Sequence, residues 1–545
     1  MKQIPLRRLI GWLVVILSLL PLLDLLHPGL PVTHDGQDHV ARIANFYQSL
    51  SEGNIVPRWA ANLNWGYGHP ILMFLYPLPS YVASLFHFIG FSFVDSTKLV
   101  FAAAFSVSML AMYWWVLEAW GVWPAFAAAV LYGFAPYRFV DLYVRGAIGE
   151  HMAYVFLPVI LWGLFTLSQK NSSRWAPYAV SLGTTLLILS HNALSIMFLP
   201  IAALYALYLG VLDGRVRIMF LLQSALYVGL GFLFSAFFWI PAYFEGKYTL
   251  RSIVMAGQFD NRFVPWSWFV YSPWNYGGTD TLSKSLGWAQ LGVVAAAIVL
   301  WFRHRNMRVI VGGTLIVLLA SLSIMTSVSL PLWTHINLLQ KFQFPWRFLS
   351  VSVFATALLG GLITAMTGKK QALVAIGVCL VAMIGTVNMW HAHVYKILPQ
   401  TFFTGIYRST TDTGESSPIW SIRFMEHTPS SAMSVIEGHA SIQNLARTTT
   451  KHVYHVTATQ SARLLENTLY FPGWNILIDG TPVSLQFQDP TYRGLMTFHV
   501  PVGDHAVIAV FTDTKLRALS AGISVASFVL FIIVLGTIPL WRKKR

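Results

Sequence analysis

Long runs of apolar residues recur along this sequence and constrain its fold more than any other feature. A helix needs about 20 predominantly apolar residues to cross the hydrocarbon core of a bilayer. Runs of about that length occur repeatedly among the 545 residues, of which 56% are hydrophobic and 10% are charged. The composition therefore indicates a polytopic α-helical membrane protein and argues against an ordinary soluble chain.

Twelve apolar runs are predicted to be transmembrane helices, with the amino terminus on the inner side. The first follows Met1–Arg8, which resembles the start of a signal peptide, but no small-residue cleavage site follows, so we expect the helix to be retained. The run Ile71–Phe91 contains Pro77 and Pro79, and counting it as a span would invert the charge pattern of the chain. We expect it to be a juxtamembrane or re-entrant helix on the outer side. The predicted spans are 9–27, 97–117, 121–138, 151–168, 174–190, 194–211, 218–240, 286–302, 308–326, 346–367, 371–390 and 517–540.

The charges are distributed very unevenly between the two predicted sides of the membrane. The net charge is +15, and sixteen of the 36 Lys and Arg residues but two of the 21 Asp and Glu residues fall on one side. This is the positive-inside pattern of a plasma-membrane protein, so we expect both termini to be cytoplasmic. Membrane lipids rather than nucleic acid are therefore the expected partners. The single cysteine, Cys379, lies in an apolar run, so neither a disulfide within the chain nor thiol chemistry is expected.

Three domains are predicted. Residues 1–390 would form a transmembrane domain, with residues 28–96 as an outer loop that carries juxtamembrane helices. Residues 391–516 would form an extracytoplasmic β-rich domain, because apolar and polar residues alternate there and turn signals such as Asp479-Gly480 separate the runs. A small β-sandwich is the expected architecture. Residues 517–545 would form the final transmembrane helix and a basic cytoplasmic tail.

The first candidate functional segment is Thr33–Arg42, which follows the first apolar run directly. It contains two carboxylates, two imidazoles and one guanidinium group within ten residues. If the segment is helical, Asp38 and Arg42 share a face because they are four residues apart. Asp35 lies at the start of that helix. An alternative is that Asp35 is only an N-cap, with Asp38 completing a turn that resembles a capping box. The spacing alone leaves both interpretations open.

The second candidate is Arg138–His151, between the third and fourth predicted spans. Glu150 and His151 lie where the chain re-enters the membrane, and ionisable residues at that depth are costly unless they serve a function. The alternative is that Glu150 merely complements the dipole at a helix N-terminus.

Three further polar or aromatic features lie on the same predicted side. His191 ends the fifth span, although a polar turn is expected there in any case. The segment 241–285 is rich in Trp and Tyr, which suit either sugar stacking or an interfacial aromatic belt. Arg347, in the motif Gln343-Phe344-Pro345-Trp346-Arg347, could bind a phosphate through its guanidinium fork or serve as an interfacial anchor.

The acidic loops, the arginines and the aromatic residues are all predicted to lie on one membrane face. This combination suits sugar transfer from a lipid phosphate. A carboxylate would take the proton of the acceptor hydroxyl. Cationic groups or a metal ion would stabilise the departing phosphate.

These motifs resemble those of a known group of proteins. The chain is similar to the GT-C superfamily of membrane glycosyltransferases, and more narrowly to YfhO-like and 6-pyruvoyl-tetrahydropterin synthase-related bacterial membrane proteins. The residues that carry the resemblance are His34-Asp35-Gly36, Pro70–Pro79, Arg145 with Glu150, Ser190-His191-Asn192, Gln343–Arg347, Tyr470–Trp474 and Ile478-Asp479-Gly480.

The resemblance implies that Asp35 is the catalytic carboxylate of the first loop and Glu150 its acidic partner in the second. It also implies a polyprenyl-phosphate-linked sugar donor and transfer with inversion. Gly36 follows Asp35 and the next acid is Asp38, so the motif departs from a plain pair of acids. Metal dependence is therefore left open. If a metal ion binds, we expect Mg²⁺ or Mn²⁺, with Asp35, Glu150 and His34 as its ligands.

The expected function is a membrane glycosyltransferase that transfers a sugar to a glycan, lipid or protein acceptor of the cell envelope. The alternatives are a transporter or flippase of lipid-linked glycans and a non-catalytic envelope polysaccharide assembly protein. The expected catalytic residues are Asp35 and Glu150. The expected substrate-binding residues are Asp38, Arg42, Arg145, His191 and Arg347.

Overall fold

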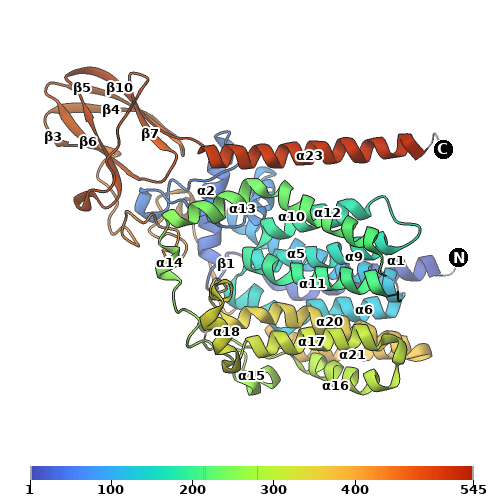
Figure 1. The fold of residues 1–545 in the computed structure, drawn as a ribbon. Coiled ribbons are helices and arrows are strands. Elements are labelled where there is room, and N and C mark those ends of the chain that lie inside the picture. Colours follow the sequence, from blue (N-terminus) through green and yellow to red (C-terminus); the bar gives the residue numbers. More distant parts are fainter. Residues whose placement is uncertain (1–2, 213, 215, 279, 543–545) are drawn as a thin grey trace. The chain divides into compact units, whose positions relative to one another are not determined.

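The structure is a computed structural model that describes residues 3–212, 214, 216–278 and 280–542, and Figure 1 shows its fold. Eight helical segments among these residues are long and apolar enough to cross a membrane. These segments are Pro5–Leu26, Phe93–Trp120, Ile148–Ser168, Asn192–Val211, Arg305–Ile324, Pro345–Met366, Gly368–Met389 and Lys515–Ile533. The prediction of a largely helical membrane-type chain is therefore confirmed.

The remaining predicted spans correspond to a bent helix pair and to three shorter helices. Helices α12 (Ile218–Phe234) and α13 (Ala236–Phe244) meet at a bend of 70° and would together count as a ninth span. The shorter helices have 12, 15 and 16 residues, or about 18–24 Å at 1.5 Å per residue, which is less than the roughly 30 Å core of a bilayer. The exact number of twelve spans therefore stays a prediction. The shorter helices are α6 (Val122–Gly133), α10 (Ala176–Ser190) and α16 (Trp288–Arg303).

The run Ile71–Phe91, which was not predicted to cross the membrane, forms two short helices. These are α3 (Ile71–Phe74) and α4 (Leu78–Phe88). The break lies at Leu75, which is extended, and just before Pro77, where proline disfavours the helical conformation of the preceding residue. With 11 residues, or about 16 Å, α4 is too short to cross a bilayer.

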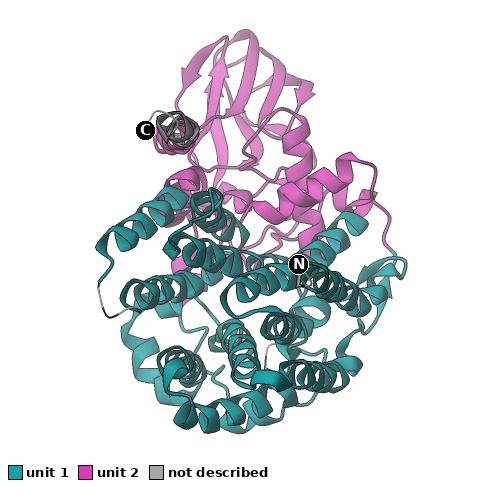
Figure 2. Cartoon of the chain, turned by 90° about the vertical axis from the view of Figure 1, so that its right-hand side faces the viewer, with its two compact units in different colours: residues 1–37, 94–232, 257–397 teal, residues 38–93, 233–256, 398–545 magenta. Residues whose placement is uncertain are grey.

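The described chain forms two compact units, which Figure 2 shows in different colours. The first unit contains most of the apolar helices and comprises residues 1–37, 94–232 and 257–397. The second comprises residues 38–93, 233–256 and 398–545, and it contains the main β-sheets. The β-rich region therefore packs with much of the predicted outer loop. The predicted domain boundaries at 390 and 516 stay predictions.

In the first unit, Asp24 ties the end of the first apolar segment to the residues after the last helix of that unit. Its carboxylate accepts hydrogen bonds from the backbone N–H of Ala392 at 2.8 Å and from the hydroxyl of Tyr395 at 2.7 Å. The short strands β1 (Leu30–Pro31) and β2 (Tyr395–Lys396) pair just beyond it. These contacts fix the chain immediately before the acidic loop at residues 33–36.

The second unit contains a five-stranded and a three-stranded antiparallel sheet. The five-stranded sheet has the order β4-β5-β10-β7-β8, and the three-stranded sheet has the order β3-β6-β9. Inward-facing residues of both sheets belong to one buried cluster, which also includes Trp59 and Phe74. The strands are β3 (Met433–Glu437), β4 (Ala440–Arg447), β5 (Lys451–Ala458), β6 (Ala462–Leu469), β7 (Trp474–Ile478), β8 (Thr481–Val483), β9 (Leu495–Val500) and β10 (Gly503–Phe511).

The turn predicted at Asp479-Gly480 is present. Ile478 pairs with Thr481, so these two residues alone connect β7 to β8. Their φ angles are +48° and +81°, and two positive φ values match the right-handed twist of a hairpin. Asp and Gly are suited to this conformation, which is why the pair was a reliable signal.

A buried polar bridge joins the two sheets. His452 on β5 and Glu466 on β6 are almost completely buried, and the Nδ1 atom of His452 lies 2.9 Å from Oε1 of Glu466. Arg447 at the end of β4 approaches the same carboxylate oxygen at 3.4 Å. Glu466 therefore holds two strands of the other sheet through one side chain.

We expect Glu466→Ala to destabilise the β-sheet region by about 3 kcal/mol, because it leaves buried polar partners without their acceptor. Hydrogen–deuterium exchange of the β5 and β6 peptides in the full chain measures this as lost protection. Glu437→Ala is the matched control, because that carboxylate pairs with Arg463 at 3.2 Å but is 61% exposed. The control should cost less than about 1 kcal/mol. Equal protection in both variants would contradict a role of the bridge in stability.

Candidate functional site

The acidic loop at residues 33–36 lies against the backbone of residues 144–146 in the first unit. The N–H of His34 donates to the carbonyl of Val144 at 3.0 Å, and that of Asp35 donates to the carbonyl of Arg145 at 2.9 Å. Helix α2 (Gly36–Ser51) begins directly after Asp35. The two loops that were predicted separately are therefore adjacent. The interpretation of Asp35 as an N-cap stays a prediction.

Glycine makes this close approach possible at Gly146. This residue ends the π-helix η3 (Val140–Arg145) in a left-handed conformation, with φ of +67°. A Cβ atom at Gly146 would lie 2.3 Å from Oγ1 of Thr33 and 3.1 Å from the backbone nitrogen of Gly36. Any other residue would be strained in its backbone and would push the acidic loop away.

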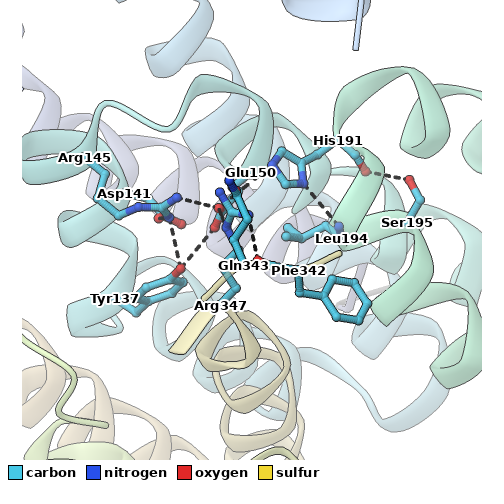
Figure 3. Close-up of polar contacts among 10 residues, drawn as sticks. All are labelled: Tyr137, Asp141, Arg145, Glu150, His191, Leu194, Ser195, Phe342, Gln343 and Arg347. Atoms are coloured by element: carbon cyan, nitrogen blue, oxygen red, sulfur yellow. Dashed lines mark hydrogen bonds and ion pairs between the residues drawn. The ribbon is translucent and has the colours of Figure 1, made fainter. Parts of the chain in front are cut away.

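A buried ion-pair cluster lies next to this contact, and Figure 3 shows its members. Arg145 donates through Nη1 to Oδ1 of Asp141 at 2.6 Å and through Nη2 to Oε1 of Glu150 at 2.7 Å. Tyr137 donates its hydroxyl to Oε2 of Glu150 at 3.0 Å. These side chains come from α7 (Pro136–Phe139), η3 and α8 (Ile148–Ala153).

Arg347 approaches Glu150 from a distant part of the sequence. Its Nε atom lies 3.3 Å from Oε1 of Glu150. Its Nη1 atom donates to the carbonyl of Phe342 at 2.8 Å and to the side-chain oxygen of Gln343 at 3.0 Å. Gln343 has a φ of +62°, which is uncommon for a residue with a Cβ. The hydrogen bonds to Phe342 and Gln343 thus hold the guanidinium group beside Glu150.

His191 completes the cluster between α10 and α11 (Asn192–Val211). Its Nδ1 accepts a hydrogen bond from the N–H of Leu194 at 3.2 Å, so the proton of the neutral ring is on Nε2, 3.9 Å from Oε1 of Glu150. Burial lowers the pKa of His191 to about 3, although Glu150 opposes the shift. The ring is therefore neutral at physiological pH.

The cluster unites four of the predicted site residues: Arg145, Glu150, His191 and Arg347. Among the charged side chains and His191 in this cluster, Arg347 is the most exposed, at 15%, whereas Glu150 is 1% exposed. An anion that entered the cluster would therefore reach Arg347 before the carboxylate.

Other predicted residues make contacts elsewhere. In the second unit, Asp38 accepts a hydrogen bond from the hydroxyl of Tyr407 at 2.9 Å, and Arg42 donates to Oγ1 of Thr411 at 3.0 Å. Each of these two residues thus forms a hydrogen bond with a residue 369 positions later in the chain. Their assignment to substrate binding stays a prediction.

The suggested metal set of Asp35, Glu150 and His34 is not assembled. Within the described ranges, no group of three or more His, Cys, Asp or Glu side chains is arranged to hold a metal ion. Glu150 instead has both oxygens engaged by arginine and tyrosine side chains. The chemistry of this donor set is that of an ion-pair network, in which the arginines supply the positive charge.

Three members of the cluster were not among the predicted site residues: Tyr137, Asp141 and Gln343. Asp141 precedes Arg145 by four residues, a spacing that can signal an ion pair on a helix. Nothing in the local sequence indicates the contacts of Tyr137 or Gln343.

We expect Gly146→Ala to release the acidic loop, because the added methyl group collides with Thr33 and the left-handed backbone is unfavourable for alanine. Hydrogen exchange of the amides of His34 and Asp35 should accelerate at least about tenfold, corresponding to roughly 1.4 kcal/mol. Gly368→Ala is the matched control, since Gly368 has a similar φ of +56° but no atom near its Cβ position. Unchanged exchange in Gly146→Ala would show that the contact does not fix the loop.

Comparisons with known proteins give one family match and a few distant structural likenesses. The model of a membrane-protein family described as 6-pyruvoyl-tetrahydropterin synthase related matches residues 72–394, more than half of the chain. An uncharacterized protein of Lactococcus lactis subsp. cremoris (strain MG1363) is 27% identical over 223 residues. That match covers 38% of this chain and 35% of the relative, so it spans about a third of the relative's length.

Two solved structures show weak similarity. The arabinofuranosyltransferase AftD from Mycobacteria gives a TM-score of 0.45 at 16% identity, over 73% of this chain and 28% of AftD. ArnT from Cupriavidus metallidurans, solved with undecaprenyl phosphate, gives a TM-score of 0.29 at 14% identity, over 71% of this chain and 79% of ArnT. The family match thus remains the finding that classifies the chain. This protein belongs to the 6-pyruvoyl-tetrahydropterin synthase-related family of membrane proteins.

Proposed function

We propose that this protein is an inverting GT-C-type glycosyltransferase that uses a polyprenyl-phosphate-linked sugar on the outer face of the bacterial plasma membrane. One observation carries the proposal: Arg145 and Arg347 converge on buried Glu150, beside the loop that contains Asp35. This arrangement supports the proposal, because arginines that suit a phosphate lie beside the backbone of the loop that contains Asp35. The acceptor is a glycan, a lipid or a protein of the cell envelope.

Arg347 is the proposed primary ligand of the donor phosphate. Its planar guanidinium group suits bidentate binding of phosphate oxygens, and its side chain is more exposed than those of Arg145 and Glu150. Phe342 and Gln343 hold one edge of the group. Arg145 contacts the same oxygen of Glu150 as Arg347 does and would add its positive charge as the phosphate departs.

Glu150 is proposed as a positioning residue rather than as the base. Its oxygens accept from Arg145 and Tyr137, and Arg347 lies within ion-pair distance. Two adjacent guanidinium groups stabilise the charged form of a carboxylate, so Glu150 is less suited to accept a proton. The proposed role of Glu150 is to hold Arg145 and Arg347 in a fixed geometry.

Asp35 is the proposed general base. It is half-buried at the start of α2, and only its backbone is bound to the ion-pair cluster. In the proposed reaction, the carboxylate takes the acceptor hydroxyl proton and the acceptor oxygen attacks the anomeric carbon. The bond from that carbon to the phosphate oxygen breaks, and the polyprenyl phosphate leaves with the electron pair.

Asp35→Asn should reduce sugar transfer by about 10²–10⁴-fold, because the amide cannot accept the hydroxyl proton. The measurement is the consumption of a polyprenyl-phosphate sugar by the purified protein in liposomes. Candidate donors can be identified by mass spectrometry of the lipid-linked sugars that accumulate when the gene is deleted. Asp95→Asn is the control, because that carboxylate is 53% exposed and lies outside the ion-pair cluster, 3.6 Å from Lys98.

Full activity of Asp35→Asn would overturn the assignment of the base. Movement of intact donor across the bilayer without sugar transfer would favour the transporter alternative. Binding of envelope polysaccharide with neither transfer nor movement would favour the non-catalytic alternative.

Arg347→Lys should raise the KM for the donor about 10- to 100-fold and change kcat less, because lysine keeps the charge but loses the bidentate fork. The expected range corresponds to about 1.5–3 kcal/mol for hydrogen bonds to a charged group. Arg303→Lys serves as the control, since Arg303 is an exposed residue at the end of α16. An unchanged KM in Arg347→Lys would show that the fork does not bind the donor.

A further inference from the structure

A third arginine, Arg138, is completely buried on α7, one residue after Tyr137. Its Nη2 donates to the hydroxyl of Ser108 at 3.0 Å, and its guanidinium carbon lies 4.1 Å from the ring centre of Tyr154. Its Nε and Nη1 atoms have no hydrogen-bond partner among the described residues. A buried cation with so few polar partners is costly, so an electrostatic role is the natural interpretation.

Asp141 is the carboxylate between Arg138 and Arg145. Its Oδ1 atom is bound by Arg145 at 2.6 Å, while its Oδ2 atom is buried without a hydrogen-bond partner among the described residues. Burial and the nearby Glu150 raise the pKa of Asp141, and Arg145 and Arg138 oppose the shift. The geometry favours the ionised form, because Arg145 lies at 2.6 Å from Oδ1 and a proton on Oδ2 would have no acceptor among the described residues. The charged or titratable groups that interact with Asp141 are Tyr137 and Arg138 from α7, Arg145 from η3, Glu150 from α8 and Tyr154 beyond it.

The resulting chain of side chains alternates in charge, in the order Arg138, Asp141, Arg145, Glu150 and Arg347. Three guanidinium groups meet two carboxylates, and His191 is neutral. The cluster therefore carries one surplus positive charge. At an effective dielectric constant of about 20, adding or removing one charge in such a cluster changes the binding of a nearby anion by roughly a factor of ten or more.

We propose that Asp141 sets the net charge of this cluster and thereby limits how tightly the site holds an anionic lipid phosphate. This inference rests on the proposed function, because that function makes the phosphate the ligand. The donor phosphodiester has one negative charge, whereas the released phosphomonoester has about −1.5 to −2 at pH 7. A cluster with two surplus charges would retain the product, so the Asp141 carboxylate favours its release.

The test compares two variants that change the charge in opposite directions. Asp141→Asn should bind farnesyl phosphate about tenfold more tightly than the unaltered protein, and Arg138→Gln should bind it about tenfold more weakly. Isothermal titration of the full chain in detergent at pH 7.5 measures both. A purely structural role would weaken binding in both variants, so the opposite signs are the specific expectation.

Two controls accompany the titration. Asp95→Asn removes an exposed carboxylate and should leave the affinity unchanged. Farnesol, which lacks the phosphate, should show no difference between the variants and the unaltered protein. Weaker or unchanged binding of farnesyl phosphate by Asp141→Asn would overturn the inference.

A second probe separates this inference from the proposed function. If the unaltered protein binds farnesyl phosphate no better than farnesol, the proposed function fails. Inorganic phosphate then still tests the charge: it should raise the melting temperature of Asp141→Asn more than that of the unaltered protein. An equal rise in both proteins would overturn the role of Asp141 as well.

Discussion

A carboxylate buried between two guanidinium groups is the interaction on which the site depends. Glu150 is 1% exposed, and an isolated charge at that position would be prohibitively costly. Arg145 and Arg347 make the burial tolerable, and in turn the carboxylate draws η3, α8 and η7 (Pro345–Phe348) together. Such networks contribute little net stability compared with apolar packing, but losing one partner is expensive. The geometry of the ion-pair cluster is therefore fixed, because any rearrangement that separates the partners would leave a buried charge unpaired.

The position of the acidic loop follows from a different constraint, the absence of a side chain at Gly146. Backbone groups of His34 and Asp35 can bind the π-helical turn only because the chains approach closely there. The loop and the ion-pair cluster thus share the same short turn. A rigid backbone contact positions the half-buried carboxylate, while long-range charges position the arginines.

The sequence predicted those structural features that require a recognisable pattern of neighbouring residues. Bilayer crossing demands long apolar runs, and each predicted run contains a helix, but apolarity alone did not show that α6 stops at Gly133. Glu150 was predicted because an ionisable residue is costly where a chain re-enters the membrane. Arg347 was predicted for its guanidinium fork, and Arg145 and His191 through motifs that resemble those of a known family. Asp38 and Arg42 were grouped with them by spacing, yet their partners Tyr407 and Thr411 lie 369 residues away. Pairings of that kind depend on tertiary folding and leave no local pattern.

The hydrogen bonds between Asp24 and Tyr395 have a consequence for how the site is assembled during synthesis. Tyr395 follows Asp24 by 371 residues, so the anchor of the first apolar segment forms only after nearly all of the first unit has been made. Contacts of such large sequence separation form slowly, because a long loop must close before they contribute. The nascent chain therefore inserts its helices before Tyr395 can fix Asp24 and the chain that leads into the acidic loop. Maturation of the site becomes a late, post-insertion event that a truncated chain cannot reach.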